Sequence, residues 1–168
     1  MSELQELIST KLIKFDIIKD VFLDIFFYVF YYLEEIMTRS RQREHAFLML
    51  FRTEFHEMKD LNDQDELYMS ELENIKDEER EYIDNKVKET RKKLPEIDAL
   101  ISEKASGWNI DRIGKVELTI LRLAVYEILF DETIPDSVAI NEAVELAKKF
   151  GQDESSAFVN GVLSKFVK

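Results

Sequence analysis

The chain has 168 residues, no cysteine and a formal net charge of −12 at pH 7. The absence of cysteine excludes disulfides, thiolate metal sites and cysteine nucleophiles, and it fits a cytoplasmic protein. A chain this acidic repels phosphate over most of its surface, so it is not a general nucleic-acid coating protein. Any RNA site must therefore be a local basic patch or depend on a basic partner.

The first 36 residues differ in composition from the rest. Residues 21–33 are apolar except for Asp24. This run is shorter than the roughly 20 residues of a membrane span, and no small-residue cleavage site follows it. We predict an extra N-terminal helix over residues 1–36, docked on the remaining chain or on a second copy. A membrane-surface anchor and a protein that begins at Met37 are the alternatives.

Residues 37–104 carry helical spacing of apolar side chains. An amphipathic helix is predicted over residues 40–58, because Phe47, Leu50, Phe51, Phe55 and Met58 recur every three or four positions. Residues 60–66 are polar and predict a loop. A short helix follows around residues 67–75, then a helix through residue 94. Pro95 fits the first turn of a further helix.

The second half begins after a break at residues 107–109. Residues 111–129 predict the most apolar helix of the chain, placed centrally in the core. A helix over 141–150 follows, with Gly151 at the position after its end. Asp153 is predicted to cap a last helix that holds Phe158, Val162 and Phe166. The chain has no strand pattern and no repeat, so we expect an all-α, compact helical bundle over residues 37–168.

The sequence offers little enzyme chemistry. The four glycines are scattered, which excludes Rossmann and Walker phosphate loops. His45 and His56 lie eleven residues apart on one predicted helix, about 16 Å at 1.5 Å per residue, so they cannot share a metal ion. The acidic segment 60–66 lacks the glycine of a calcium loop. We predict no catalytic residue, no metal and no cofactor.

Charge is unevenly distributed. Residues 57–82 hold eleven acidic and three basic residues, whereas residues 37–56 hold four arginines and two glutamates. Arg39, Arg41 and Arg43 lie at the start of a helix, where guanidinium groups and free backbone N–H groups both bind phosphate. By itself this arm is equally consistent with a solubilising segment.

The second half carries a specific resemblance. WNIDRIG at 108–114 leads into KVELTILRLAVYE at 115–127, followed by IPDSVAINEAVELAKKFG at 134–151 and FVNGVL at 158–163. RQREHAFLMLF at 41–51 looks like the matching first helix. The chain from Met37 onward closely resembles the NusB family of transcription antitermination factors, most specifically in its second half.

This resemblance implies an all-helical fold of two packed halves. It implies that the chain binds boxA-type RNA of ribosomal RNA leaders jointly with NusE, a small-subunit ribosomal protein, within the transcription elongation complex. The matching positions place RNA at Arg39, Ser40, Arg41, Arg43, Lys148, Lys149, Glu154 and Asn160. They place NusE at Phe51 and Glu117. Asn160 and Gly161 lie inside a helix, where glycine costs about 1 kcal/mol, so a close helix approach or a ligand contact is expected there.

Two other functions are alternatives. RNA cytosine methyltransferases carry a similar domain ahead of a catalytic domain, so the chain is also consistent with a detached accessory domain. It is also consistent with a helical protein that self-associates through the aromatic N-terminal run, which is a large apolar patch to leave in water. Monomer and homodimer both stay open.

Overall fold

The computed structural model describes residues 37–56, 60–105 and 109–167. The predicted N-terminal helix, and Gly107 and Trp108 of the predicted break, lie outside these residues. The structure divides at Met37, and the unit described below is Thr38–Lys168. The described residues of this unit form six α-helices and two 3₁₀ turns, which confirms the all-α prediction.

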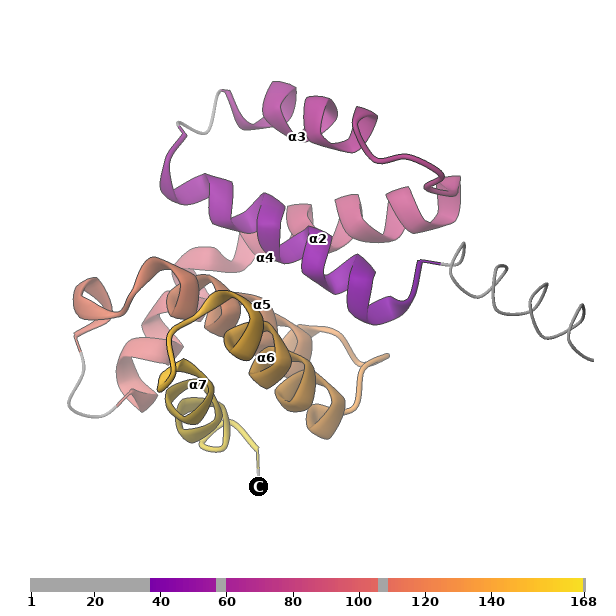
Figure 1. Ribbon diagram of the computed structural model, residues 1–168. Coiled ribbons are helices and arrows are strands. Elements are labelled where there is room, and N and C mark those ends of the chain that lie inside the picture. The colour runs from indigo at the N-terminus through magenta and orange to yellow at the C-terminus, as the bar shows by residue number, and fades with distance from the viewer. Residues whose placement is uncertain (1–36, 57–59, 106–108, 168) are drawn as a thin grey trace, which may run out of the picture. The chain divides into compact units, whose positions relative to one another are not determined.

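The helices form two packed halves, as Figure 1 shows. They are α2 (Arg39–Phe51), α3 (Leu61–Ser70), α4 (Asp77–Lys104), α5 (Lys115–Phe130), α6 (Asp136–Phe150) and α7 (Ser155–Leu163), with 3₁₀ turns η1 (Arg52–Glu54) and η2 (Ile110–Arg112). Helix α5 packs against α2, α4, α6 and α7. Its residues Ile120, Leu121 and Val125 are fully buried. The predicted central position of this apolar helix is therefore confirmed.

Helix α4 is continuous, so the predicted new helix at Pro95 is wrong. Pro95 lies inside α4, where it removes one backbone hydrogen bond. The buried positions Val87, Thr90, Ile97 and Ile101 keep their helical spacing on both sides of the proline. Because Pro95 itself is exposed, burial of this unbroken face outweighs the local cost.

The segment predicted as a loop at 60–66 is also helical, and belongs to α3. Leu61, Asp65 and Met69 are buried at four-residue spacing. The middle position of this buried stripe is an acid, whose carboxylate pairs with Arg91 of α4. A polar residue at a core position hid the helical pattern, because periodicity arguments count only apolar residues.

Several predicted boundaries move as well. Helix α2 ends at Phe51, ahead of the predicted residue 58, and continues only as η1. Helices α5 and α6 begin at 115 and 136 where 111 and 141 were predicted. The predicted cap at Asp153 is wrong, because the residue before α7 is Glu154 and its side chain makes no capping hydrogen bond.

Gly151 follows α6 as predicted, but for a different reason. Its φ of −92° is not left-handed. A Cβ at this position would lie 2.4 Å from Ser155 Cβ and 2.7 Å from the Ala147 carbonyl oxygen. The glycine is needed because α7 starts against the end of α6, and not because the backbone turns into a left-handed conformation.

Charged side chains buried between the helices join four of them. Arg43 Nε of α2 lies 2.9 Å from both carboxylate oxygens of Glu127 on α5. Lys86 Nζ of α4 lies 3.3 Å from Glu127 and 2.5 Å from Asp131. Arg43 Nη1 also lies 3.1 Å from Glu142 of α6. Burial lowers the pKa values of Arg43 and Lys86, but the carboxylates outweigh burial and both pKa values are raised.

Arg43→Ala should strongly destabilise the fold. It leaves Glu127, whose side chain is 1 % exposed, with Lys86 as its remaining charged partner. Breaking a buried ion pair in this way costs about 3 kcal/mol or more. Arg41→Ala, two residues earlier on the exposed face of α2, should change the free energy of unfolding by less than about 0.5 kcal/mol. Urea denaturation of both variants measures the difference, and equal losses would contradict this role of Arg43.

Candidate functional site

The predicted basic arm is the first turn of α2. The Thr38 hydroxyl caps the helix by accepting from the Arg41 backbone N–H at 3.2 Å. Arg39, Ser40 and Arg41 are exposed. The Arg39 guanidinium lies 4.1 Å above the centre of the Tyr82 ring. The first turn of α2 therefore exposes two arginine side chains beside the backbone N–H groups of the helix N-terminus, and this end of the helix is positively charged.

Arg43 is not part of this exposed surface. The sequence predicted a solvated RNA contact, yet only 4 % of Arg43 is exposed. Its guanidinium is held between Glu127 and Glu142. Because a buried, paired arginine cannot reach a phosphate without breaking these ion pairs, the expectation that Arg43 is solvated is wrong.

A hollow of about 320 Å³ brings four of the predicted residues together. Ser40 and Arg41 of α2 line it with Lys148 and Lys149 of α6. The residues of α2 are more than 100 positions from those of α6 in the chain; Lys149, for example, contacts Glu44, which lies 105 positions earlier. Only the packing of α2 beside α6 makes them one surface.

Carboxylates balance the cations of this hollow. Lys149 Nζ lies 2.7 Å from both oxygens of Glu44, and Lys148 Nζ lies 2.7 Å from Glu145. The Ser40 hydroxyl donates to Glu142 at 2.8 Å. Both lysine side chains are 57 % exposed, so their ion pairs contribute at most about 1 kcal/mol each. An incoming phosphate can therefore displace these carboxylates at small cost.

Glu154 and Asn160 lie elsewhere on the unit. Glu154 lines a second hollow of about 560 Å³, together with Glu117 and Phe158. Asn160 is exposed on α7. Among the described residues, no other part of the fold lies within 4 Å of a Cβ built on Gly161, so the close helix approach expected there is wrong. A contact with a ligand or partner stays a prediction for this pair.

Glu117 is held at the start of α5. Its carboxylate accepts a hydrogen bond from the Ser155 hydroxyl of α7. A Cβ on Gly114 would lie 2.2 Å from the other carboxylate oxygen, so glycine leaves the space into which Glu117 folds. Glu117 is half-buried and still lines the open hollow beside Phe158.

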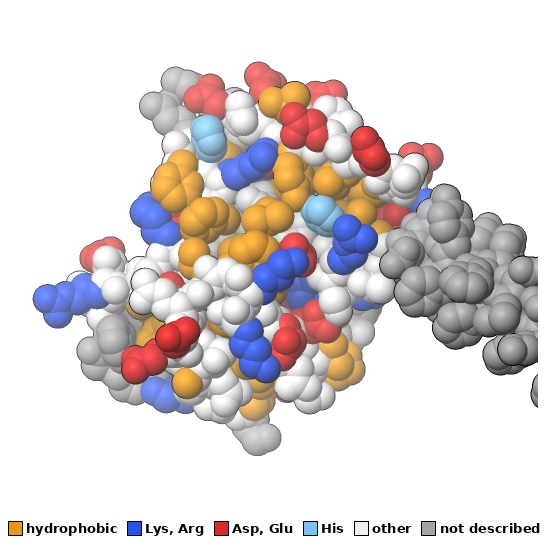
Figure 2. All heavy atoms as spheres, in the orientation of Figure 1, with side chains coloured by type: hydrophobic (Ala, Val, Ile, Leu, Met, Phe, Trp, Pro, Cys, Tyr) orange, Lys and Arg blue, Asp and Glu red, His pale blue; other side chains and the backbone are white. Residues whose placement is uncertain are grey.

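A row of aromatic rings leads from the core to the surface at the end of α2. Ring centroids are 4.9 Å apart for Phe150 and Phe47, 5.9 Å for Phe47 and Phe51, and 5.1 Å for Phe51 and Phe55. Phe55 is 61 % exposed, and hydrophobic side chains gather over this part of α2 in Figure 2. The sequence singled out Phe51 and missed Phe55 as a surface residue, because Phe55 was placed on the buried face of a longer helix.

Lys115, the first residue of α5, contacts this aromatic end. Lys115 Nζ lies 5.0 Å from the centre of the Phe55 ring and 3.1 Å from Glu54 Oε2. Arg122 also pairs with Glu54. Burial raises the pKa of Glu54, but the hydrogen bonds and charges of Lys115 and Arg122 outweigh burial and hold the pKa below its ordinary value.

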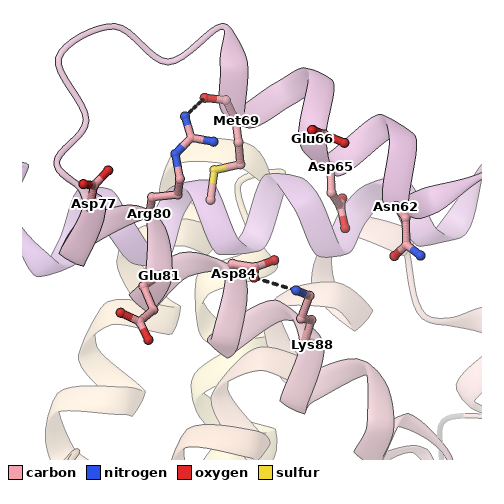
Figure 3. Close-up of a pocket in the computed structure, with 9 residues that line it drawn as sticks. All are labelled: Asn62, Asp65, Glu66, Met69, Asp77, Arg80, Glu81, Asp84 and Lys88. Atoms are coloured by element: carbon pink, nitrogen blue, oxygen red, sulfur yellow. Dashed lines mark hydrogen bonds and ion pairs between the residues drawn. The ribbon is translucent and has the colours of Figure 1, made fainter.

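An acidic groove runs between α3 and α4 (Figure 3). Its volume is about 590 Å³, and five carboxylates and two cations line it: Asp65, Glu66, Asp77, Glu81, Asp84, Arg80 and Lys88. Arg80 donates to the Met69 carbonyl at 2.8 Å, and Lys88 pairs with Asp84 at 2.6 Å. This face repels nucleic acid, so an RNA path is confined to other parts of the unit.

Among residues 37–56, 60–105 and 109–167, no group of three or more His, Asp or Glu side chains is arranged to hold a metal ion. None of the helices within these ranges is long and apolar enough to cross a membrane.

Sequence comparison identifies relatives over this same unit. The NusB family model matches residues 40–168. The transcription antitermination protein NusB of Agathobacter rectalis is 59 % identical over 130 residues, which cover 77 % of this chain and 99 % of that protein. The protein of the same name from Lachnoclostridium phytofermentans is 50 % identical over 131 residues, covering 78 % and 99 %.

Solved structures agree with this match. T. maritima NusB superposes with a TM-score of 0.68 at 32 % identity, covering 77 % of this chain and 89 % of that one. A crystal structure of the antitermination factors NusB and NusE in complex with double-stranded RNA gives a TM-score of 0.65 at 32 % identity. It covers 77 % of this chain and 97 % of the matched chain.

The lowered pKa of Glu54 predicts a pH dependence of stability. A depressed folded-state pKa contributes stability above the ordinary value of 4.5, and this contribution is lost as pH falls through the folded-state pKa. Glu54→Gln should therefore be less stable than the natural chain at neutral pH, and the two should converge in acid. Urea midpoints measured between neutral and acid pH test this, with the exposed Glu145→Gln as a control for the loss of one charge. A constant difference at every pH would contradict it.

Proposed function

Because the chain belongs to the NusB family, we propose that it is an antitermination adaptor that binds boxA-type RNA of ribosomal RNA leaders together with NusE. Two curated relatives carry the name transcription antitermination protein along 99 % of their own length. A NusB of this fold has been crystallised with NusE and double-stranded RNA. These relationships support an RNA-binding and partner-binding role for the present chain.

The hollow between α2 and α6 carries the proposal. It combines the capped N-terminus of α2 with Arg41, Lys148 and Lys149, all exposed. Guanidinium, ammonium and helix N-terminal N–H groups all bind phosphate in proteins. Arg39 extends the same surface toward Tyr82. Arg43 takes no part in RNA binding in this proposal. Its buried ion pairs hold the N-terminal end of α2 in place.

The charge balance of the hollow explains why a partner is needed. Glu44, Glu142 and Glu145 lie among its cations, and the whole chain carries a net charge of −12. RNA affinity of the chain alone is therefore low. A basic ribosomal protein that shares the RNA supplies the missing positive charge and increases the rate of encounter.

The aromatic side chains at the end of α2 support the proposal that NusE binds there. Phe51 and the exposed Phe55 form an edge-to-face pair beside Lys115. Aromatic side chains are enriched at protein interfaces, where a few buried anchors contribute most of the binding energy. Glu117 lies two residues from Lys115, with its carboxylate facing an open hollow. We place a basic side chain of NusE against Glu117 and an apolar segment of NusE against Phe55.

Lys148→Glu should weaken binding of a boxA-type RNA by about tenfold in the presence of NusE. It removes one charge-assisted phosphate contact, which should also reduce the salt dependence by about 0.7 per contact for a single strand. Arg41→Glu should have a similar effect. Fluorescence anisotropy at several salt concentrations measures both quantities.

Lys92→Glu is the matched control for Lys148→Glu. Each lysine is exposed and forms an ion pair with a glutamate three positions earlier in its helix, Lys92 with Glu89 and Lys148 with Glu145. The two variants therefore have the same net charge, and each loses one exposed ion pair. If both weaken RNA binding equally, the effect is one of total charge and the hollow is not the RNA site.

Phe55→Ala should weaken NusE binding by about tenfold or more, because an exposed aromatic anchor is lost. The exposed Leu129 of α5 provides the control Leu129→Ala. Glu117→Gln keeps an oxygen that can accept from Ser155 but removes the charge, so it should weaken NusE binding without lowering the melting temperature. Titration calorimetry and melting curves measure these effects. Unchanged NusE affinity of Phe55→Ala and Glu117→Gln would overturn the assignment of this surface.

A further inference from the structure

A further hollow shares Glu142 with the α2–α6 hollow, which is the proposed phosphate surface. Its volume is about 380 Å³, and α2, α4, α6 and the connection before α6 contribute to it. Glu142 lines both hollows, so they are neighbours on one continuous surface. The volume falls in the range of small-molecule pockets, and one nucleobase is smaller than this.

Half of the residues that line this hollow are apolar or aromatic. Ile134, Pro135 and Val138 line it together with the half-buried Tyr82 ring. Val138 is 41 % exposed, although it belongs to a helix whose Ala139 and Ala143 are buried. A hollow lined by an aromatic ring and aliphatic side chains is the kind of surface on which proteins stack unpaired bases.

The charges around the hollow suit a nucleotide. Arg39 is its exposed cation, and the buried Arg43 and the carboxylate of Glu142 also line it. Part of the charge of Glu142 is compensated, since Ser40 donates to one of its oxygens and Arg43 lies 3.1 Å from the other. Arg39 is exposed, rests on the Tyr82 ring and donates to Gln42 Oε1 at 2.9 Å. A base that stacks on this ring takes the place of the guanidinium, which is then free to bind a phosphate at the rim.

We propose that this hollow is a base-binding pocket for one unpaired nucleotide of the RNA, with its base stacked on Tyr82 and its phosphate on Arg39. The inference rests on the proposed RNA-binding function and adds a site beyond the arm and the α2–α6 hollow. Continuity with that hollow identifies RNA as the occupant, because the strand that crosses Arg41 and Ser40 needs only to pass Glu142 to reach Tyr82.

The test is an abasic scan of a short single-stranded boxA RNA, measured with NusE present. In the natural chain, removing the base at one position should weaken binding by about tenfold, since base–aromatic stacking contributes on that scale. In Tyr82→Ala the penalty at that position should disappear, and in Tyr82→Phe, which retains the ring, it should persist. 2-Aminopurine at the same position should be quenched by the natural chain and by Tyr82→Phe, but not by Tyr82→Ala.

A second variant guards against misfolding of Tyr82→Ala. Val138→Asp places an anion at the exposed mouth of the pocket and should weaken RNA binding about tenfold, while Leu129→Asp, at a similarly exposed apolar position, should not. The proposal is overturned if no base position responds to Tyr82→Ala and Val138→Asp binds RNA like Leu129→Asp. It is also overturned if these variants weaken NusE binding in the absence of RNA, because the occupant is then a protein segment.

Failure of the pocket and failure of the proposed function give different results. If the natural chain with NusE does not bind boxA RNA, both fall together. If it binds, and Lys148→Glu weakens binding while Tyr82→Ala and Val138→Asp do not, only the base pocket is wrong.

Discussion

The ion pair between Arg43 and Glu127 is the constraint on which the arrangement of the helices depends. Both side chains are almost fully buried, and Lys86 and Glu142 complete their contacts. Charges in a protein interior are tolerated only in the geometry that pairs them, so α2, α4, α5 and α6 can meet in few other ways. Aliphatic contacts alone would leave the rotation of α2 against α6 much freer.

The exposed surfaces follow from this constraint. Arg43 holds the first turn of α2 against α6, which places Ser40 and Arg41 beside Lys148 and Lys149. At the other end of the same helix, the edge-to-face pair of Phe51 and Phe55 lies beside the start of α5. One helix therefore carries the proposed RNA surface at its N-terminus and the proposed partner surface at its C-terminus, while the acidic groove between α3 and α4 excludes nucleic acid from another face.

Periodicity identified the helices with apolar faces and failed where the buried face was polar or interrupted. The central helix α5 was predicted well because nearly every side is apolar. Helix α3 was mistaken for a loop because Asp65 occupies its buried stripe, paired with Arg91. Pro95 was taken as a helix start, because its local cost is visible in the sequence and the burial of Ile97 and Ile101 that offsets it is not.

By itself the sequence determined the all-helical class, the uneven charge and the family resemblance, because each depends only on the types of residues and their spacing over short stretches of the chain. Only the tertiary structure decided which charged residues are available. Arg39, Arg41 and Arg43 look alike in the sequence, yet Arg43 is buried and paired with Glu127, which lies 84 positions later in the chain. The burial of a charged side chain depends on partners that the fold brings to it, so neighbouring arginines end in opposite environments, with Arg43 paired in the core and Arg39 and Arg41 exposed to solvent.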